Sequence, residues 1–533
     1  MKKREPLDFL KELIRKIPFA DELYWYLQQA NYPPPGSFSL HRVEERLPQW
    51  CKEATKARQT AKPGKKVFVF AAYRPWMRQM TLTGLALAGL GHDISFGYLP
   101  YTTWQEEEDQ SNLKRQDAHI EKSLELTKPL LQLVPMRNLA TGKQLPHEII
   151  EKLEELSLRD VKYSLLREDV ERDSDLYRLR MKRNSALAKA ALTWMENNTP
   201  DVVVVPNGSV LEFGVIFHVA RYLGVQVVTY EFGEQHERMW LAQNRDVMRQ
   251  ETDQMWDVYH DKPLTEEEWE RIKKMFSARQ GVDLWENSSR QWQKTASQGE
   301  EKVRAELGLD QRPIVFIPTN VLGDSLTLGR QIFSKGMTEW LTRTIQYFID
   351  HPQYQLVIRI HPGEQLGWGP SVYEILESYF ENLPEHIHII PADAAINSYD
   401  LVEAASFATV FTTTLGMEMA MSGLSVIVVG ETHYRKKGFT LDPNSWKEYF
   451  DFLVNLLENP TERNLSKKQV EQAWVYAYRF FFDYPRPFPW HVQHFWKNVN
   501  KWPLEKVLSQ EGRSKFEDTF RYLVGEPMYV NEA

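Results

Sequence analysis

The sequence predicts an α/β protein made of two Rossmann-like domains that face a cleft. Three observations support this prediction: apolar runs of strand length recur along the chain, helical patterns separate them, and the alternation restarts near residue 312. The chain has 533 residues, enough for two or three domains with cores of their own. Its 42% hydrophobic and 26% charged residues are typical of a soluble globular protein.

The charge and the cysteine content exclude several protein classes. The formal net charge of −8 is mild and argues against general nucleic-acid binding. Cys51 is the only cysteine, which excludes a disulfide framework and argues against a cysteine-based metal site. This usage favours the cytoplasm as the compartment. No apolar run approaches the ~20 residues of a membrane span.

Residues 1–64 predict an N-terminal helical extension. The start, "MKKREPLDFLKELIRKIPFADELYWYL", is basic but lacks a continuous apolar core, so it is not typical of a signal peptide. Its apolar positions share one helical face: Leu7, Leu10, Leu13, Ile14 and Ile17. Two interpretations stay open. The helix lies at the inner face of the membrane, which makes the protein peripheral, or it packs on its own domain. We favour the second.

The first Rossmann-like domain is predicted over residues 65–300. It opens with a buried strand, "KKVFVFAAY" (65–73), and "TLTGLALAGLGHDISFGYLPY" continues as a helix, a glycine stop and a second strand. This order is a βαβ unit of the doubly wound type. Residues 105–200 are charged and mostly helical in pattern.

The rest of this domain continues the alternation. "PDVVVVPNGS" (200–209) predicts a buried strand with a polar end, "VLEFGVIFHVARYLG" a helix, and "VQVVTYEFGE" (225–234) the next strand. Residues 260–305 are polar and predict a connection that contains helices.

The second Rossmann-like domain is predicted over residues 301–470. Its strands are "RPIVFIPTNV", "YQLVIRIHPGE", "HIHIIPAD", "FATVFTTT" and "LSVIVVGE". Its helices are "MTEWLTRTIQYFIDH", "SYDLVEAAS" and "LGMEMAMSG". Because two βα-repeating halves of similar size follow one another, we expect twin domains with a cleft between them.

Residues 471–533 predict a C-terminal helical segment that is very rich in aromatic residues. Interleaved aromatic and basic residues over 474–502 are compatible with stacking on bases or sugars. A helix and loop that pack across the two domains explain the same pattern, and we favour that interpretation.

Polar side chains follow three predicted strands of the second domain. "TNVLGDS" (319–325) follows the first strand, "RIHPGE" (359–364) ends the second, and "TTTLGMEMAMSG" (412–423) leads from a later strand into a helix. The carboxyl ends of parallel strands meet at one edge of a sheet, where open α/β sheets bind ligands. We therefore expect these side chains to converge on one rim.

The chemistry of this rim fits a nucleotide. Thr412, Thr413 and Thr414 precede a helix with Gly416 and Glu418, and hydroxyls and amides at a helix start form an anion site. Glu418 is placed to accept two ribose hydroxyls. An ordinary helix cap explains the threonines alone.

Other residues extend this predicted nucleotide site. His361 is placed to donate to a phosphate oxygen, and a neighbouring anion favours its protonated form. Arg359 shares a strand face with His361, and Asn320 and Glu364 belong to the same strand ends. Lys436 and Lys437 either reach a phosphate or a donor carboxylate, or lie in a solvated loop.

A family resemblance covers about 312–445. The run "RIHPGE…NSYDLVEAASFATVFTTTLGMEMAMSGLSVIVVGETHYRKKGFTLDP" resembles the capsule polysaccharide biosynthesis family, which includes transferases of 3-deoxy-manno-octulosonic acid (Kdo) from its CMP ester. That family resembles GT-B glycosyltransferases, including bacterial sialyltransferases. The resemblance implies a GT-B-like fold, an acceptor domain followed by a donor domain, and CMP held by His361 with Pro362 and by Thr413 with Thr414.

The resemblance also implies a catalytic base in the first domain. The sialyltransferases carry an acidic-acidic-glycine motif whose first acid is the base. The matching run here is "YEFGE", which makes Glu231 the candidate, although Phe232 departs from the pattern. Glu212, Glu234 and His236 stay open as alternative bases.

The sequence therefore predicts a cytoplasmic GT-B-type glycosyltransferase. Its donor would be a nucleotide-activated sugar, with a CMP-sugar such as CMP-Kdo first and a UDP-sugar second. Its acceptor would be a growing capsule or surface polysaccharide, as a glycan or a lipid-linked glycan. No Asp-x-Asp pair follows a strand, so we expect metal-independent transfer, and we expect no cofactor.

Three alternatives to this function remain open. A nucleotide-sugar epimerase shares the twin fold. A glycerophosphotransferase also uses a His-Pro element and a hydroxyl-rich strand end. A non-catalytic carbohydrate-binding or scaffold protein of polysaccharide assembly would bind nucleotide without turnover, or would not bind it.

Overall fold

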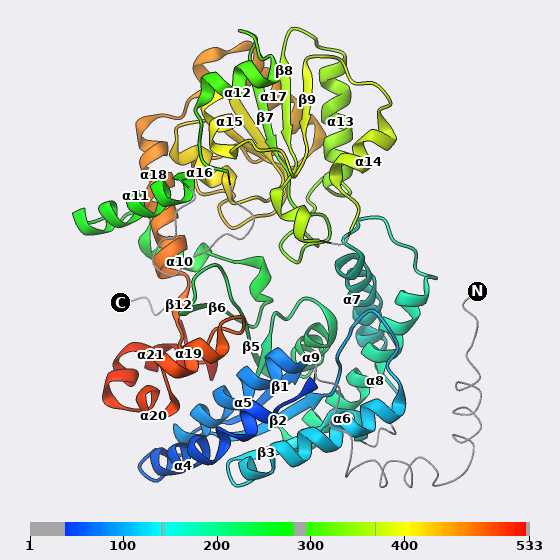
Figure 1. The fold of residues 1–533 in the computed structure, drawn as a ribbon, viewed down its shortest axis with the longest axis vertical. Helices are drawn as coiled ribbons and strands as arrows, with labels where there is room; N and C mark the ends of the chain where they lie inside the picture. Colours follow the sequence, from blue (N-terminus) through cyan, green and yellow to red (C-terminus); the bar gives the residue numbers. More distant parts are fainter. Residues whose placement is uncertain (1–37, 140–141, 143, 282–294, 368, 529–533) are drawn as a thin grey trace.

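The computed structural model describes residues 38–139, 142, 144–281, 295–367 and 369–528. Two α/β halves lie one above the other, each built on its own sheet (Figure 1). In each half the first five strands run in the spatial order 3-2-1-4-5 of a doubly wound fold. The predicted fold class, two Rossmann-like domains, is confirmed. The apolar face expected between Leu7 and Ile17 lies outside the described residues.

The sheet of the first domain has seven strands in the order β12-β6-β5-β4-β1-β2-β3. Its parallel strands are β1 (Lys66–Ala72), β2 (Asp93–Leu99), β3 (Leu131–Pro135), β4 (Val202–Pro206) and β5 (Gln226–Glu231). Two antiparallel strands extend its edge, β6 (Arg238–Gln243) and β12 (Arg486–Pro487). The central strand β1 pairs with both β2 and β4, so the carboxyl ends of β1 and β4 are neighbours.

Helices cover both faces of this sheet: α3 (His41–Glu44), α4 (Leu47–Arg58), α5 (Arg74–Gly89), α6 (Gln110–Ser123), α7 (His147–Leu165), α8 (Asp175–Asn198) and α9 (Leu211–Tyr222). Side chains of β1 alternate between the two faces. Val67 and Val69 share a core with α4 and α5, whereas Phe68 and Phe70 share a core with α7, α8 and α9. A strand buried on both faces is apolar at every position, which explains the continuous apolar run.

The sheet of the second domain has five parallel strands in the order β11-β10-β7-β8-β9. They are β7 (Ile314–Pro318), β8 (Gln355–Arg359), β9 (Ile387–Ile390), β10 (Phe407–Val410) and β11 (Val426–Val428). Its helices are α12 (Glu300–Leu307), α13 (Met337–Ile349), α14 (Val372–Tyr379), α15 (Ser398–Ala404), α16 (Leu415–Met421) and α17 (Trp446–Glu458). Val315 and Ile317 of β7 pack with α13 and α17, whereas Ile314 and Phe316 pack with α15 and α16.

Two helices from the polar connection belong to the core of the second domain. They are α10 (Asp253–Tyr259) and α11 (Glu266–Gly281). Met255, Ile272 and Phe276 share a core with the second sheet, although the sequence-based boundary had placed them in the first domain. Their few apolar side chains are spread thinly through a charged stretch, which is why the composition alone did not reveal this packing.

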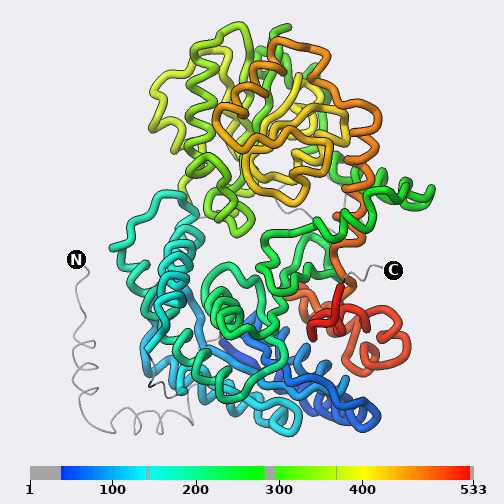
Figure 2. The backbone as a smooth tube through the Cα atoms, turned by 180° about the vertical axis from the view of Figure 1, so that it is seen from behind, coloured from blue at the N-terminus to red at the C-terminus, as the bar shows by residue number. Residues whose placement is uncertain are grey.

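The C-terminal segment returns from the second domain to the first (Figures 1 and 2). It consists of α18 (Lys467–Tyr478), a π-helical turn (Arg479–Asp483), β12, α19 (Phe495–Lys501), α20 (Leu504–Val507) and α21 (Gln510–Leu523). Its aromatic side chains are divided between two cores. Tyr476 and Phe480 pack in the second domain, whereas Phe488 and Trp490 pack in the first. The chain thus joins the domains twice.

A direct contact between the domains lies at the start of α13. The carboxylate of Glu168, in the loop between α7 and α8, accepts hydrogen bonds from the backbone N–H groups of Met337 (2.7 Å) and Thr338 (2.9 Å). The N-cap residue of α13 is Gly336, which has no side chain to satisfy these donors. A carboxylate of the first domain therefore caps a helix of the second.

Candidate active site

The carboxyl ends of both sheets open onto one cavity of about 840 Å³ between the domains. The first domain contributes Asn207 and Glu231, which follow β4 and end β5. The second contributes the segments that follow β7, β8, β9, β10 and β11. Open α/β sheets bind ligands where the strand order reverses. The reversal point of the second sheet, between β7 and β10, lies at this cavity, and the first sheet contributes Asn207 from beside its own reversal point. The volume lies within the range of about 300–1,000 Å³ that is usual for small-molecule sites.

Glu231 is the carboxylate that the first domain presents to this cavity. It is half-buried, and burial raises its pKa to about 7. Hydrogen bonds from the backbone N–H of Phe232 (3.0 Å) and from Asn207 Nδ2 (3.1 Å) oppose that rise, whereas the nearby Asp324 carboxylate adds to it. A carboxylate with a pKa near neutrality is suited to general-base catalysis.

Two alternative bases also line the cavity. Glu234 forms an ion pair with Arg279 Nη1 at 2.7 Å. His236 has its pKa lowered to about 4 by burial and by His494 and Lys497, so its ring is neutral at physiological pH.

The third alternative, Glu212, does not face the cavity. Its side chain is fully buried, where it pairs with Arg180 (3.0 Å) and accepts a hydrogen bond from the Tyr73 hydroxyl (2.7 Å). Arg180 pairs in turn with Asp160 at 3.1 Å. This network links α8 to α7 and α9. Glu212 is therefore not placed to act as a base, and this alternative assignment was wrong.

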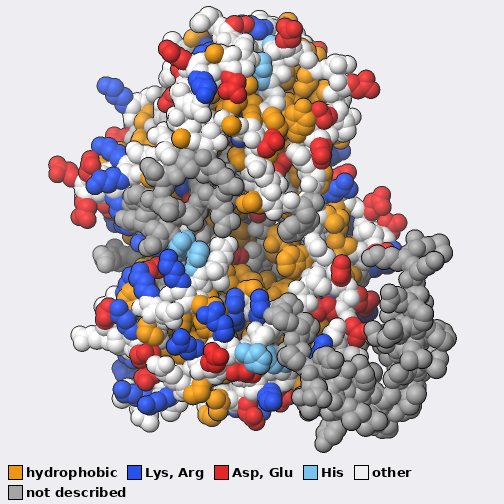
Figure 3. All heavy atoms as spheres, in the orientation of Figure 1, with side chains coloured by type: hydrophobic (Ala, Val, Ile, Leu, Met, Phe, Trp, Pro, Cys, Tyr) orange, Lys and Arg blue, Asp and Glu red, His pale blue; other side chains and the backbone are white. Residues whose placement is uncertain are grey.

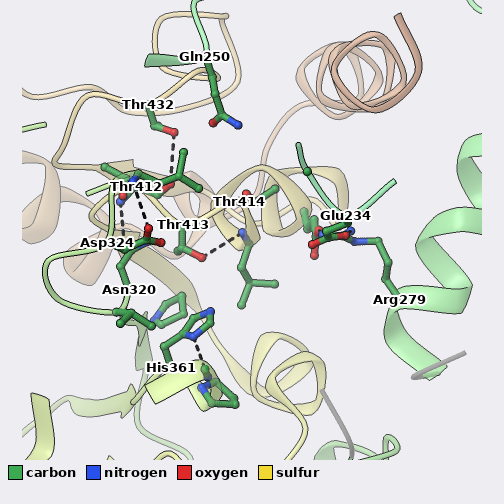
Figure 4. Close-up of a pocket in the computed structure, with 18 of the residues that line it drawn as sticks. Glu234, Gln250, Arg279, Asn320, Asp324, His361, Thr412, Thr413, Thr414 and Thr432 are labelled. Carbon is green, nitrogen blue, oxygen red and sulfur yellow. Dashed lines mark hydrogen bonds and ion pairs between the residues drawn. The ribbon is translucent and has the colours of Figure 1, made fainter. Parts of the chain in front are cut away.

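His361 lies at the carboxyl end of β8 and faces the cavity, as the sequence predicted (Figure 4). Its backbone N–H donates to Thr319 Oγ1 (2.9 Å), which fixes the turn. Its Nδ1 accepts a hydrogen bond from the Gly363 N–H at 3.0 Å. Because Nδ1 acts as an acceptor, a neutral ring carries its proton on Nε2. The ring is therefore set up as a hydrogen-bond donor through Nε2.

The loop after β10 lies opposite the first domain and carries three threonines (Figure 4). The Thr412 N–H donates to Asn320 Oδ1 at 3.2 Å, and this orients the amide of Asn320 with its NH₂ group as the donor. The carbonyl of Thr413 accepts from the Tyr434 hydroxyl at 2.6 Å. The buried Thr412 Oγ1 has no hydrogen-bond partner among the described residues. Hydroxyl and amide donors are thus concentrated in this loop.

Glu418 lines the cavity but is engaged by other side chains. Its Oε1 contacts Arg279 Nη2 at 2.6 Å, and its Oε2 accepts from the Tyr399 hydroxyl. Arg279 comes from α11 and bridges Glu418 to Glu234 of the first domain (Figure 4). The predicted contact of Glu418 with ribose hydroxyls therefore requires these partners to be exchanged.

Arg359 lines the cavity but binds the protein backbone, whereas the sequence predicted that it would bind the nucleotide. Its guanidinium donates to the carbonyls of Ala394 (3.1 Å) and Ile396 (3.4 Å), and burial lowers its pKa to about 10. Both carbonyl residues line the cavity, so Arg359 positions that loop.

Three further predicted donor-site residues lie outside the described lining of the cavity. Glu364 accepts from Ser371 Oγ (2.7 Å) at the start of α14, and Lys437 pairs with Asp253. A Cβ at Gly416 would come within 2.3 Å of the Tyr434 hydroxyl, so this glycine makes room for packing. The sequence pattern identified their loops correctly but not the direction of each side chain. Pro362, by contrast, lines the cavity beside His361.

Several lining residues were not among the predicted site residues. Asp324, whose pKa is raised by burial, lies in the quoted "TNVLGDS" run, and Asn207 lies in "PNGS", so local signals existed for both. Tyr399 lies in the quoted "NSYDLVEAAS" run, although no role was assigned to it, whereas Arg279 comes from a helix to which no sequence signal pointed.

Basic side chains gather on one face of the first domain. Figure 3 shows lysine and arginine side chains gathered on the lower half, with histidines beside them. The pKa of Arg78 is lowered by burial and by the neighbouring Arg74 and Arg42. Such a concentration of positive charge attracts anionic ligands.

The described residues contain neither a metal cluster nor a membrane-spanning helix. No group of three or more His, Cys, Asp or Glu side chains among them is arranged to hold a metal ion. None of the helices in the described part of the chain is long and apolar enough to cross a membrane.

Comparisons with known proteins give structural likenesses alone. No protein-family model matches the chain, and no curated protein matches it. Among solved structures, a β-Kdo 2,4 transferase (KpsC) of Thermosulfurimonas dismutans is 14% identical, with a TM-score of 0.34, over 52% of this chain and 79% of that one. A UDP-GlcNAc 2-epimerase of Neisseria meningitidis, bound to UDP-GlcNAc, is 11% identical, with a TM-score of 0.24, over 78% and 99%. These values are too low to indicate a reaction or a substrate.

Proposed function

We propose that this chain is a glycosyltransferase that moves a sugar from a nucleotide-activated donor to a hydroxyl group of a glycan. One observation carries the proposal. Glu231 of the first domain, with a pKa of about 7, lines the same cavity as His361 and the threonine loop of the second domain. A base and a set of phosphate donors on opposite walls are what glycosyl transfer needs.

The two domains take complementary parts in the proposed reaction. The nucleotide phosphate binds to the hydroxyl of Thr412, the amide of Asn320 and Nε2 of His361. The sugar then extends towards the first domain. Glu231 removes the proton of the acceptor hydroxyl as its oxygen attacks the anomeric carbon. The bond from that carbon to the phosphate oxygen breaks, and hydrogen bonds stabilise the charge on the departing phosphate.

The donor and the acceptor are proposed from the sequence resemblance. A CMP-sugar such as CMP-Kdo is the first candidate donor and a UDP-sugar the second. The acceptor is a capsule or surface polysaccharide under construction, as a glycan or a lipid-linked glycan. The roughly 840 Å³ of the cavity is large enough for a nucleotide and its sugar together. We also propose that no metal ion takes part, so transfer should survive EDTA.

Nucleotide binding tests the proposal first. CMP, UDP and GDP are compared with cytidine, uridine and guanosine by thermal shift and calorimetry on the full chain. A ligand that binds the folded state raises the melting temperature by mass action. One nucleotide should stabilise the protein clearly more than its nucleoside, because the proposed contacts are made to the phosphate.

The same preparation is then assayed with the sugar esters of the nucleotide that binds. Transfer to a glycan acceptor supports the proposal. Appearance of an isomeric donor sugar without acceptor would identify an epimerase instead. If none of the nucleotides stabilises the protein more than its nucleoside, the glycosyltransferase proposal is wrong and the scaffold alternative is favoured.

A further inference from the structure

A second cavity of about 350 Å³ adjoins the proposed active site within the first domain. It shares Tyr163, Asn207 and Glu231 with the interdomain cavity. Its other lining residues follow β1 and β2 or lie at the starts of α5 and α9, and Phe38 joins them from the segment before α3. Glu231 therefore stands at the boundary between two spaces, and the proposed mechanism accounts for one of them.

Aromatic residues make up half of the lining of this second cavity. They are Phe38, Tyr73, Trp76, Tyr101, Trp104, Tyr163 and Phe213. Edge-to-face packing holds them in place: the centroids of Tyr73 and Trp104 are 5.6 Å apart, and those of Trp76 and Phe213 are 5.8 Å apart. Trp76 and Trp104 remain partly exposed. These ring contacts thus position the aromatic side chains of the wall.

Trp104 also carries an unused hydrogen-bond donor. Its Nε1 is buried and has no hydrogen-bond partner among the described residues. Leaving a buried donor unpaired is unfavourable, and such groups in folded proteins call for an explanation. A ligand hydroxyl in the cavity would satisfy it. Asn207 and Glu231 supply further polar groups at the boundary with the main cavity.

An aromatic wall with a few fixed polar groups matches the chemistry of a sugar ring. The C–H groups of a pyranose pack on an aromatic face, while its hydroxyls need donors and acceptors at the edge.

We propose that this cavity is the acceptor subsite and that it takes the terminal pyranose ring of a glycan, packed against Trp76 and Trp104. The inference rests on the proposed glycosyl transfer and adds the acceptor to it. The acceptor hydroxyl is directed at Glu231, which takes its proton. The hydroxyl oxygen bonds to the anomeric carbon, and the phosphate leaves with the electron pair of the broken bond.

Fluorine NMR tests the subsite without any need for turnover. The full chain is labelled with 5-fluorotryptophan, and Trp76→Phe, Trp104→Phe and Trp446→Phe assign three of the resonances. Trp446 lies on α17 of the second domain and serves as the reference. The probes are methyl glycosides of glucose, galactose, N-acetylglucosamine and Kdo. We expect at least one probe to shift the Trp76 and Trp104 resonances and to leave that of Trp446 unchanged.

Steady-state kinetics gives the second readout. Trp104→Ala should raise the KM for the glycan acceptor about tenfold, as the loss of one aromatic contact would, and leave the nucleotide affinity unchanged. Trp104→Phe, which keeps a ring but removes the donor, should have a smaller effect. The matched control Trp446→Ala should change neither quantity.

The outcomes separate this inference from the proposed function. Suppose that the wild type binds nucleotide and transfers sugar. If Trp104→Ala then keeps the wild-type acceptor KM and no saccharide shifts the Trp76 and Trp104 resonances, the acceptor subsite is wrong and the proposed function stands. If a nucleotide shifts these resonances and no saccharide does, the cavity holds the donor base and the subsite is wrong. If the wild type lacks turnover but saccharides shift both resonances, the cavity is a saccharide-binding site, and both the acceptor role and the enzyme proposal fall.

Discussion

Among single residues, Glu231 matters most to the proposed reaction, because its surroundings disfavour the charged form of its carboxyl group. Burial raises its pKa to about 7, so the carboxyl group is largely protonated below that pH and ionised above it. A general base acts in its ionised form. We therefore expect kcat/KM for transfer to rise about tenfold per pH unit up to about pH 7 and to level off above it.

A pH profile of transfer between about pH 5 and about pH 9 checks this expectation. Nucleotide affinity over the same range is the control, because Glu231 contacts the acceptor in the proposed mechanism. A profile that stays flat through this range would remove Glu231 from the base role.

His361 supplies the second prediction at this scale. In the proposal its Nε2 donates to the nucleotide phosphate, and hydrogen bonds to charged groups are worth about 1.5–3 kcal/mol. His361→Ala should weaken nucleotide binding by roughly ten- to a hundredfold, measured by calorimetry. His147→Ala is the matched control, because the side chain of His147 is 86% exposed on α7. Equal affinities in the two variants would show that His361 does not hold the nucleotide.

At the scale of secondary-structure elements, the start of α13 depends on the other domain. Glu168 accepts from two backbone N–H groups that Gly336 cannot satisfy. Glu168→Ala should lower the free energy of unfolding by about 1 kcal/mol, the usual value of an N-cap. Glu171→Ala, an exposed carboxylate of the same loop, is the control. Denaturant unfolding measures both, and equal stabilities would mean that Glu168 contributes no cap.

Several of the strands that the sequence predicted are buried on both faces, and this burial makes them apolar along most of their length. β1, β4 and β7 are of this kind. By contrast, β3 and β6 lie at or near the sheet edge and are only partly buried. Their apolar and polar residues alternate over too few positions to predict a strand. The rim of the site was predicted from the strand ends on a separate ground. In a parallel sheet all carboxyl ends lie at the same edge, so the residues that follow them come together.

Side-chain direction is what the sequence did not predict. Arg359, Glu364 and Lys437 follow or end predicted strands, yet each binds a neighbouring loop or helix. Arg279 reaches the cavity from a helix whose sequence gave no sign of its position. Such pairings depend on tertiary contacts between residues far apart in the chain, which local spacing does not encode.

At the scale of the whole molecule, Arg279 links the two domains. It pairs with Glu234 of the first domain and with Glu418, which is 2% exposed, in the second. Removing one partner of a buried ion pair leaves an uncompensated charge and costs about 3–5 kcal/mol. Arg279→Leu should therefore destabilise the second domain by an amount of this order, measured by denaturant unfolding.

A second variant separates the ion pair from simple loss of packing. Adding Glu418→Gln to Arg279→Leu removes the stranded charge and should restore much of the lost stability. If the double variant is no more stable than the single one, the buried charge does not account for the loss.

The central claim is that transfer occurs in the interdomain cavity with Glu231 as the base, and Glu231→Gln tests it most directly. Nucleotide affinity and transfer rate are measured on one preparation of the variant, beside wild type and Glu234→Gln. We expect Glu231→Gln to bind nucleotide normally and to transfer about a hundred- to ten-thousandfold more slowly, the usual cost of losing a general base. Transfer at the wild-type rate by Glu231→Gln, with its loss in Glu234→Gln, would contradict the claim.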